Sequence, residues 1–92
     1  MSFIKKIKFN KASITFKKLE MKFQNGTSRD FDLVSWMLII DHLMNGAETQ
    51  EQQRTVDNAV NVYKNYLHKH FPTHSFLNEN NGLEDIKGPK SL

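Results

Sequence analysis

A long amphipathic pattern between Thr49 and Pro72 sets the strongest limit on the fold. Thr49 followed three residues later by Gln52 matches a capping box, in which side chains satisfy the free amide groups of a helix start. Pro72 disfavours a helical backbone at Phe71 and ends the pattern. Between these signals, apolar residues recur at helical spacing on one side: Val56, Ala59, Val60, Val62, Tyr63, Tyr66 and Leu67. We therefore expect a helix of about 20 residues that buries one face.

The preceding segment predicts another helix, from about Ser28 to Met44 or Asn45. Thr27 and Asp30 have the spacing of a capping box, and Gly46 is suited to the left-handed residue that ends a helix. Apolar residues cover an arc of about 160° at 100° per residue. They are Leu33, Trp36, Met37, Ile39, Ile40, Leu43 and Met44. Because further apolar residues project from the other side, we expect this helix to be central or to form a subunit contact.

The first residues have a different period. In the run FIKKIKF, Phe3, Ile7 and Phe9 fall on one side of an extended chain, and Lys6 and Lys8 fall on the other. A period of two in a short aromatic and β-branched run is typical of a half-buried strand. We therefore predict a strand here, followed by a tight connection.

A second strand is expected in residues 14–23, where the apolar phase changes at Lys17 and Lys18. This change indicates a bulge or a break into a third short strand, and Asn25-Gly26 then predicts a turn. The predicted fold class is α+β with the order ββαα. It has a two- or three-stranded antiparallel N-terminal sheet that two antiparallel helices cover on one face.

The predicted domain is a single unit over residues 1–72. The polar residues 73–92 contain Gly82, Gly88 and Pro89, and predict a C-terminal tail that is partly docked or disordered, with a mobile end.

Positive charge is concentrated at the N-terminus. Residues 1–24 hold seven lysines and one acid, for a net charge of +6, whereas residues 25–92 have a net charge of −3. The predicted basic sheet face consists of Lys6, Lys8, Lys17, Lys18 and Lys22. Such a face could meet nucleic acid, a membrane surface or an acidic protein, or it could simply protect an exposed sheet from aggregation. Eleven lysines against two arginines disfavour base-specific recognition.

The candidate partner-binding patch is apolar and consists of Val34, Trp36 and Leu38. Surplus apolar surface on a small protein marks an interface. Alternatively, the C-terminal tail covers this patch within the monomer through Phe76 and Leu77.

Several chemistries are disfavoured by the residues present. The chain has no cysteine, no phosphate-cradling glycine loop and no Gly-x-Ser-x-Gly motif. His68 and His70 would diverge by about 200° on a helix, so they could not share a metal ion while both are helical. We expect no enzyme activity, no catalytic residue, no metal site and no cofactor.

These features predict a small non-enzymatic binding protein that regulates or inhibits a protein partner by stoichiometric contact. Its size and its lysine- and asparagine-rich composition are typical of phage and mobile-element proteins. Two alternatives are a nucleic-acid-binding module of low specificity that uses the lysines, and an assembly subunit that forms a homodimer. The N-terminus lacks the features of a signal peptide, and the longest apolar run, Trp36–Ile40, is short. A cytoplasmic location and no membrane partner are therefore expected.

Overall fold

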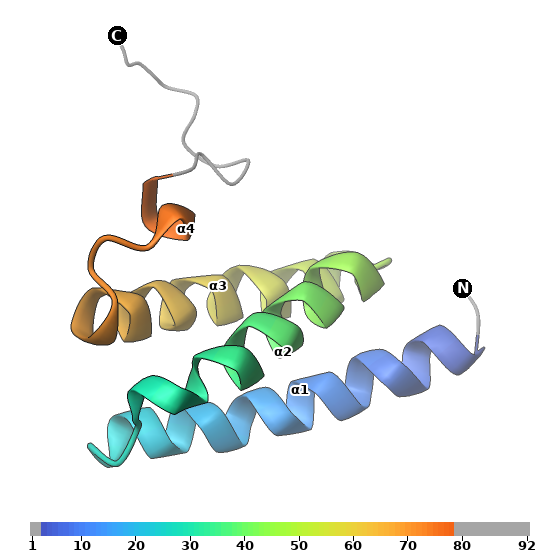
Figure 1. Ribbon diagram of the computed structural model, residues 1–92. Coiled ribbons are helices and arrows are strands. Elements are labelled where there is room, and N and C mark those ends of the chain that lie inside the picture. The colour runs from blue at the N-terminus through green and yellow to red at the C-terminus, as the bar shows by residue number, and fades with distance from the viewer. Residues whose placement is uncertain (1–2, 79–92) are drawn as a thin grey trace, which may run out of the picture.

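The protein is helical throughout the part that the structure, a computed structural model, describes, namely residues 3–78 (Figure 1). In chain order the elements are α1 (Phe3–Gln24), the short 3-10 helix η1 (Asp30–Asp32), α2 (Leu33–Gly46), α3 (Gln50–His70) and α4 (Ser75–Asn78). Residues 3–78 contain no strand. The predicted α+β class, with an N-terminal sheet, is therefore wrong.

The N-terminal segment forms the helix α1 because its second apolar pattern has a helical period. Phe9, Ala12, Phe16 and Leu19 follow one another at spacings of three and four residues, and all four are buried. Neither Gly nor Pro interrupts residues 3–24. The apparent period of two arose because other apolar residues lie on the opposite side of the same helix. When a helix is apolar on two opposite faces, a short stretch of its sequence does not show the helical period.

The predicted turn at Asn25-Gly26 is present, as the end of α1. Gly26 has φ = +76°, and its amide donates to the carbonyl of Phe23 at 3.1 Å. The amide of Thr27 donates to the carbonyl of Lys22 at 2.9 Å. This pair of hydrogen bonds with a left-handed glycine is a Schellman motif, which satisfies the last carbonyls of a helix.

The helix start predicted at about Ser28 is shifted, because α2 begins at Leu33 and the capping box lies before it, at the start of η1, with Arg29 in place of Thr27. The amide of Arg29 donates to the carboxylate of Asp32 at 2.9 Å, so Asp32 serves the role predicted for Asp30. Gly46 also differs from the prediction, because it is the last helical residue and Ala47 after it is extended. A Cβ atom at Gly46 would lie 3.4 Å from the ring of Phe9, so close packing against α1 explains a small residue here.

The prediction for α3 is confirmed. The amide of Gln52 donates to Thr49 Oγ1 at 3.1 Å, and the amide of Thr49 donates to Gln52 Oε1 at 3.1 Å, which is the expected capping box. The helix ends at His70, before Pro72. Four residues of the predicted tail form α4. The mobile end that was predicted for the tail falls within residues 79–92, which lie outside the described residues.

The three long helices run back and forth, with α2 in contact with both α1 and α3 (Figure 1). Trp36 of α2 is completely buried and stacks on Tyr63 and Tyr66 of α3, with ring centroids 5.9 and 5.1 Å away. Phe16 of α1 contacts the indole in a T-shaped arrangement, with ring centroids 6.0 Å apart. This aromatic cluster joins the three helices and forms the centre of the core.

Candidate functional site

The predicted apolar patch divides into exposed and buried residues. Val34 and Leu38 are 65% and 57% exposed, whereas Trp36 is 0% exposed. Trp36 lies four residues before Ile40 and seven before Leu43, on the face of α2 that packs into the core. Trp36 therefore stabilises the fold and presents no surface to a partner, while Val34 and Leu38 do.

Leu38 lies beside an open apolar groove between α2, α3 and α4. The groove has a volume of about 470 Å³, within the usual range for binding pockets. Its lining residues are Met37, Leu38, Ile40, Asp41, Met44, Tyr63, His74 and Phe76. We call this surface the apolar groove.

One wall of the apolar groove comes from the segment after Pro72. The ring of Phe76 lies 4.8 Å from that of Tyr63, centroid to centroid. His74 Nδ1 accepts a hydrogen bond from the amide of Phe76 at 3.0 Å, which holds the turn into α4. Residues 73–78 of the tail thus pack beside the predicted patch, and among the described residues Val34 and Leu38 stay exposed.

The sequence reasoning missed the methionines of this groove. Met37 and Met44 were assigned to the buried arc of their helix, yet they are 46% and 44% exposed. The available signal was the width of that arc, because an arc of about 160° exceeds what one contacting helix buries. Asp41 is the acidic residue of the groove, and its carboxylate accepts a hydrogen bond from the side-chain amide of Asn45 at 3.1 Å.

The five lysines of the predicted basic face lie on α1 rather than on a sheet. Lys22 is engaged, because its ammonium lies 3.0 Å from Asp32 Oδ1 and 5.9 Å from the ring centroid of Phe31. The other four, Lys6, Lys8, Lys17 and Lys18, are exposed and form no ion pair within residues 3–78. The predicted concentration of charge therefore exists, but as part of a helix surface.

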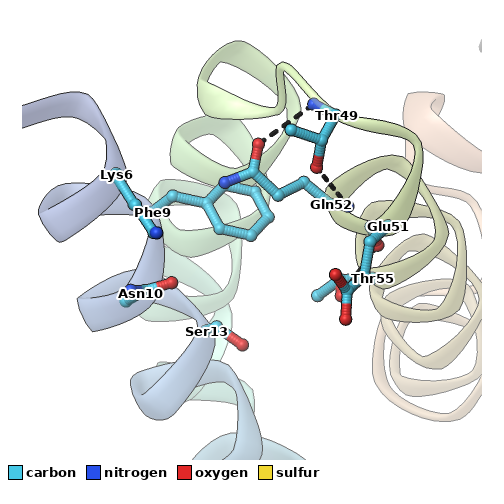
Figure 2. Close-up of a pocket in the computed structure, with 8 residues that line it drawn as sticks. All are labelled: Lys6, Phe9, Asn10, Ser13, Thr49, Glu51, Gln52 and Thr55. Atoms are coloured by element: carbon cyan, nitrogen blue, oxygen red, sulfur yellow. Dashed lines mark hydrogen bonds between the residues drawn. The ribbon is translucent and has the colours of Figure 1, made fainter. Parts of the chain in front are cut away.

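A second, polar groove separates α1 from the start of α3 (Figure 2). Its volume is about 360 Å³, and it is lined by Lys6, Phe9, Asn10, Ser13, Thr49, Glu51, Gln52 and Thr55. Figure 2 shows Phe9 projecting from α1 across this space toward Gln52. Thr49 and Gln52 are already hydrogen-bonded to each other's backbone amides. Their main role is to cap α3. The charged residues that remain are Lys6 on α1 and Glu51 on α3, on opposite sides of the groove.

Ser28, His70 and Asp30 meet at the other end of α3, although their contacts join residues 40 and 42 positions apart. Ser28 Oγ lies 3.0 Å from His70 Nε2, and His70 Nδ1 lies 2.7 Å from Asp30 Oδ1. This is the order of groups in a serine hydrolase triad. Ser28, however, is only 3% exposed, and Asp30 is open to solvent, the reverse of what an accessible nucleophile and a buried orienting carboxylate require. The cluster instead fastens the segment before α2 to the end of α3.

Tyr66 strengthens the same connection. Its hydroxyl donates to the carbonyl of Arg29 at 2.5 Å. Burial, together with the nearby carboxylates of Asp32 and Asp30, raises the pKa of Tyr66 to about 12. The phenol therefore stays protonated and remains a donor at neutral pH.

The described residues hold neither a metal cluster nor a spanning helix. Within residues 3–78, no group of three or more His, Cys, Asp or Glu side chains is arranged to hold a metal ion. None of the helices in that range is long and apolar enough to cross a bilayer. Comparisons with family models, curated proteins and solved structures gave no match to this chain.

Proposed function

We propose that this protein is a non-enzymatic regulator that binds an amphipathic helix of a protein partner in the apolar groove. The observation that carries the proposal is the pair Val34 and Leu38. Leu38 lines the open groove, Val34 lies one turn before it on the same helix, and both are exposed and outside the core cluster. A contiguous apolar surface of this kind marks an interface when it adjoins a concave site.

The chemistry of the lining favours a helix as the occupant. Leu38, Asp41 and Met44 lie along two turns of α2, so the lining extends along a helix axis and can accommodate the apolar face of an incoming helix. Methionine side chains adapt to varied apolar shapes because they are unbranched and flexible. Asp41 would favour a partner that carries a basic residue beside its apolar anchors.

The test compares capture of proteins from the source cells by the wild type, by Leu38→Asp and by Ile14→Asp. Ile14 is a matched control, because it is 59% exposed and lies on α1, away from the groove. We expect one partner to survive nuclease and raised salt, and to be lost with Leu38→Asp but kept with Ile14→Asp. The captured partner is then purified, and its dissociation constant should rise at least about tenfold with Leu38→Asp.

Two results would contradict the proposal. Capture that nuclease abolishes would indicate a nucleic-acid bridge instead of a protein contact. Alternatively, the groove could be filled by the chain's own Leu83 and Ile86. In that case, changing both to Ser would destabilise the protein as much as Leu38→Asp does, and no partner would depend on Leu38.

A further inference from the structure

Helix α1 is apolar on two opposite sides, and only one of them is covered by the described residues. The inner side packs on α2 and α3 through the buried residues described above. The outer side carries Phe3, Ile4, Ile7, Ile14 and Met21, all exposed, with Phe3 at 77% and Met21 at 60%. In Figure 1, α1 forms one edge of the molecule, and α2 and α3 both lie on the same side of it. The outer apolar residues therefore do not contribute to the core.

Lysines flank this outer row on both sides. At about 100° per residue, Ile7, Ile14 and Met21 fall within an arc of about 40°. On the same projection, Lys6 and Lys17 border the arc on one side, and Lys11 and Lys18 border it on the other. These lysines are exposed and form no ion pair within the part of the chain that the structure describes. We call the apolar row with its lysines the outer face of α1.

We propose that the outer face of α1 binds the surface of an anionic lipid bilayer. Its apolar side chains insert at the boundary between headgroups and acyl chains, and its lysines lie against the anionic headgroups. A helix of 22 residues is about 33 Å long and would lie parallel to the surface. Lysine is suited to this position because its apolar stem can stay near the lipid while the ammonium reaches the headgroups.

A second copy of the chain fits this face less well. Two identical outer faces would bring lysines opposite lysines, and like charges in contact oppose association. An acidic helical protein avoids that repulsion but needs two apolar rows to form a seam. The row at Ile7, Ile14 and Met21 is apolar, whereas the companion row contains Asn10 and Lys17. A helical partner would have to bury these polar groups, and a bilayer surface would not.

Nucleic acid also fits this face less well. Phosphates would pair with the lysines. A phosphate backbone, however, offers no apolar surface to bury the exposed Phe3, Ile7 and Ile14 of the same face. A bilayer surface satisfies both kinds of side chain at once. The expectation of no membrane partner rested on a short apolar run and on an N-terminus unlike a signal peptide. A helix that lies on a bilayer surface needs neither feature, so the helical geometry of α1 is the reason for departing from that expectation.

The inference is independent of the proposed function. α4, which forms one wall of the apolar groove, lies at the opposite edge of the molecule from α1 (Figure 1). A protein partner in the groove and a bilayer at α1 would therefore occupy different surfaces. Each proposal can fail without the other.

The test is cosedimentation of the full chain with vesicles of phosphatidylcholine alone and of phosphatidylcholine mixed with phosphatidylserine. We expect binding to the anionic vesicles, weakened by salt, and little binding to the neutral ones. Ile14→Asp should weaken binding by about tenfold or more. Changing Lys11 and Lys18 together to Gln should also weaken it by about tenfold or more. Leu38→Asp, on the other side of the molecule, should leave it unchanged, and circular dichroism checks that each variant is folded.

Three results would overturn the inference. The first is absent binding, or equal binding to both kinds of vesicle. The second is binding to RNA or duplex DNA in preference to anionic vesicles, with no effect of Ile14→Asp. The third is a dimer in solution that Ile14→Asp dissociates, which would assign the outer face to a second copy of the chain.

Discussion

At the scale of single residues, Asp32 completes the capping box of η1, directly before α2. Its carboxylate accepts from the Arg29 amide at 2.9 Å and lies 3.0 Å from the Lys22 ammonium, so it joins the end of α1 to the start of α2. Burial by itself raises the pKa of Asp32. The Arg29 hydrogen bond and the Lys22 charge together outweigh that effect and lower the pKa below its ordinary value of 3.8.

A pH-dependent loss of stability follows from this lowered pKa. The contribution of the Asp32 charge is fully present above about pH 3.8, the ordinary value, and is lost as pH falls through the lower pKa of the folded state. Asp32→Asn should cost about 1 kcal/mol of unfolding free energy near neutral pH. The difference from the wild type should shrink at about pH 3. Urea unfolding at both pH values measures it, and a constant difference would show that the charge of Asp32 contributes nothing.

At the scale of elements, the two glycines in the described helix ends have different physical roles. Gly26 adopts φ = +76° in open space, whereas Gly46 is helical and lies against Phe9. The first is needed for a backbone conformation that other residues adopt with strain, and the second for close packing. A helix boundary and a helix contact can thus select the same residue type.

The two glycines should respond differently to alanine. Gly26→Ala should lower the free energy of unfolding by about 1 kcal/mol, because the left-handed conformation is strained for a residue with a Cβ atom. Gly46→Ala should change it by less than about 0.5 kcal/mol, because a 3.4 Å contact with Phe9 is almost ordinary and alanine favours the helix. Thermal unfolding followed by circular dichroism separates them. Equal effects would mean that the left-handed turn at Gly26 is not the reason for that glycine.

At the scale of the whole molecule, the apolar residues of α2 divide between the buried core and the exposed apolar groove. Leu43 is completely buried in the core, whereas Leu38 is mainly exposed at the apolar groove. Two leucines of one helix therefore differ in burial, because they lie on different sides of it.

Alanine substitution should make this division measurable. Leu43→Ala should cost about 2–5 kcal/mol of unfolding free energy because it leaves a cavity in the core. Leu38→Ala should change stability by about 0.5 kcal/mol or less. Trp36 is the sole tryptophan and is completely buried, so its fluorescence reports urea unfolding of both variants. A large cost for Leu38→Ala would place Leu38 in the core and weaken the proposed function.

Part of this structure was predictable because its signals lie close together in the chain. The capping box of Thr49 and Gln52, the helix end before Pro72 and the turn at Gly26 each depend on a few neighbouring residues. Such patterns specify backbone conformation without reference to the rest of the molecule. The exposure of Val34 and Leu38 also followed from their position on the helix surface.

Other features depended on contacts between distant segments. The stacking of Trp36 on Tyr63 and Tyr66 and the contact between Ser28 and His70 each join separate parts of the chain. The methionine-lined groove exists only because the segment after Pro72 folds beside α2 and α3.

The sequence by itself determined where α3 begins and ends, because its capping box and Pro72 act on the backbone next to them. Only the tertiary structure decided that α1 is a helix with one covered and one open apolar face, and that Trp36 is buried. The physical reason is that apolar residues on opposite sides of α1 give an ambiguous local period. Packing against α2 and α3 then selects the helix that buries Phe9, Phe16 and Leu19 together.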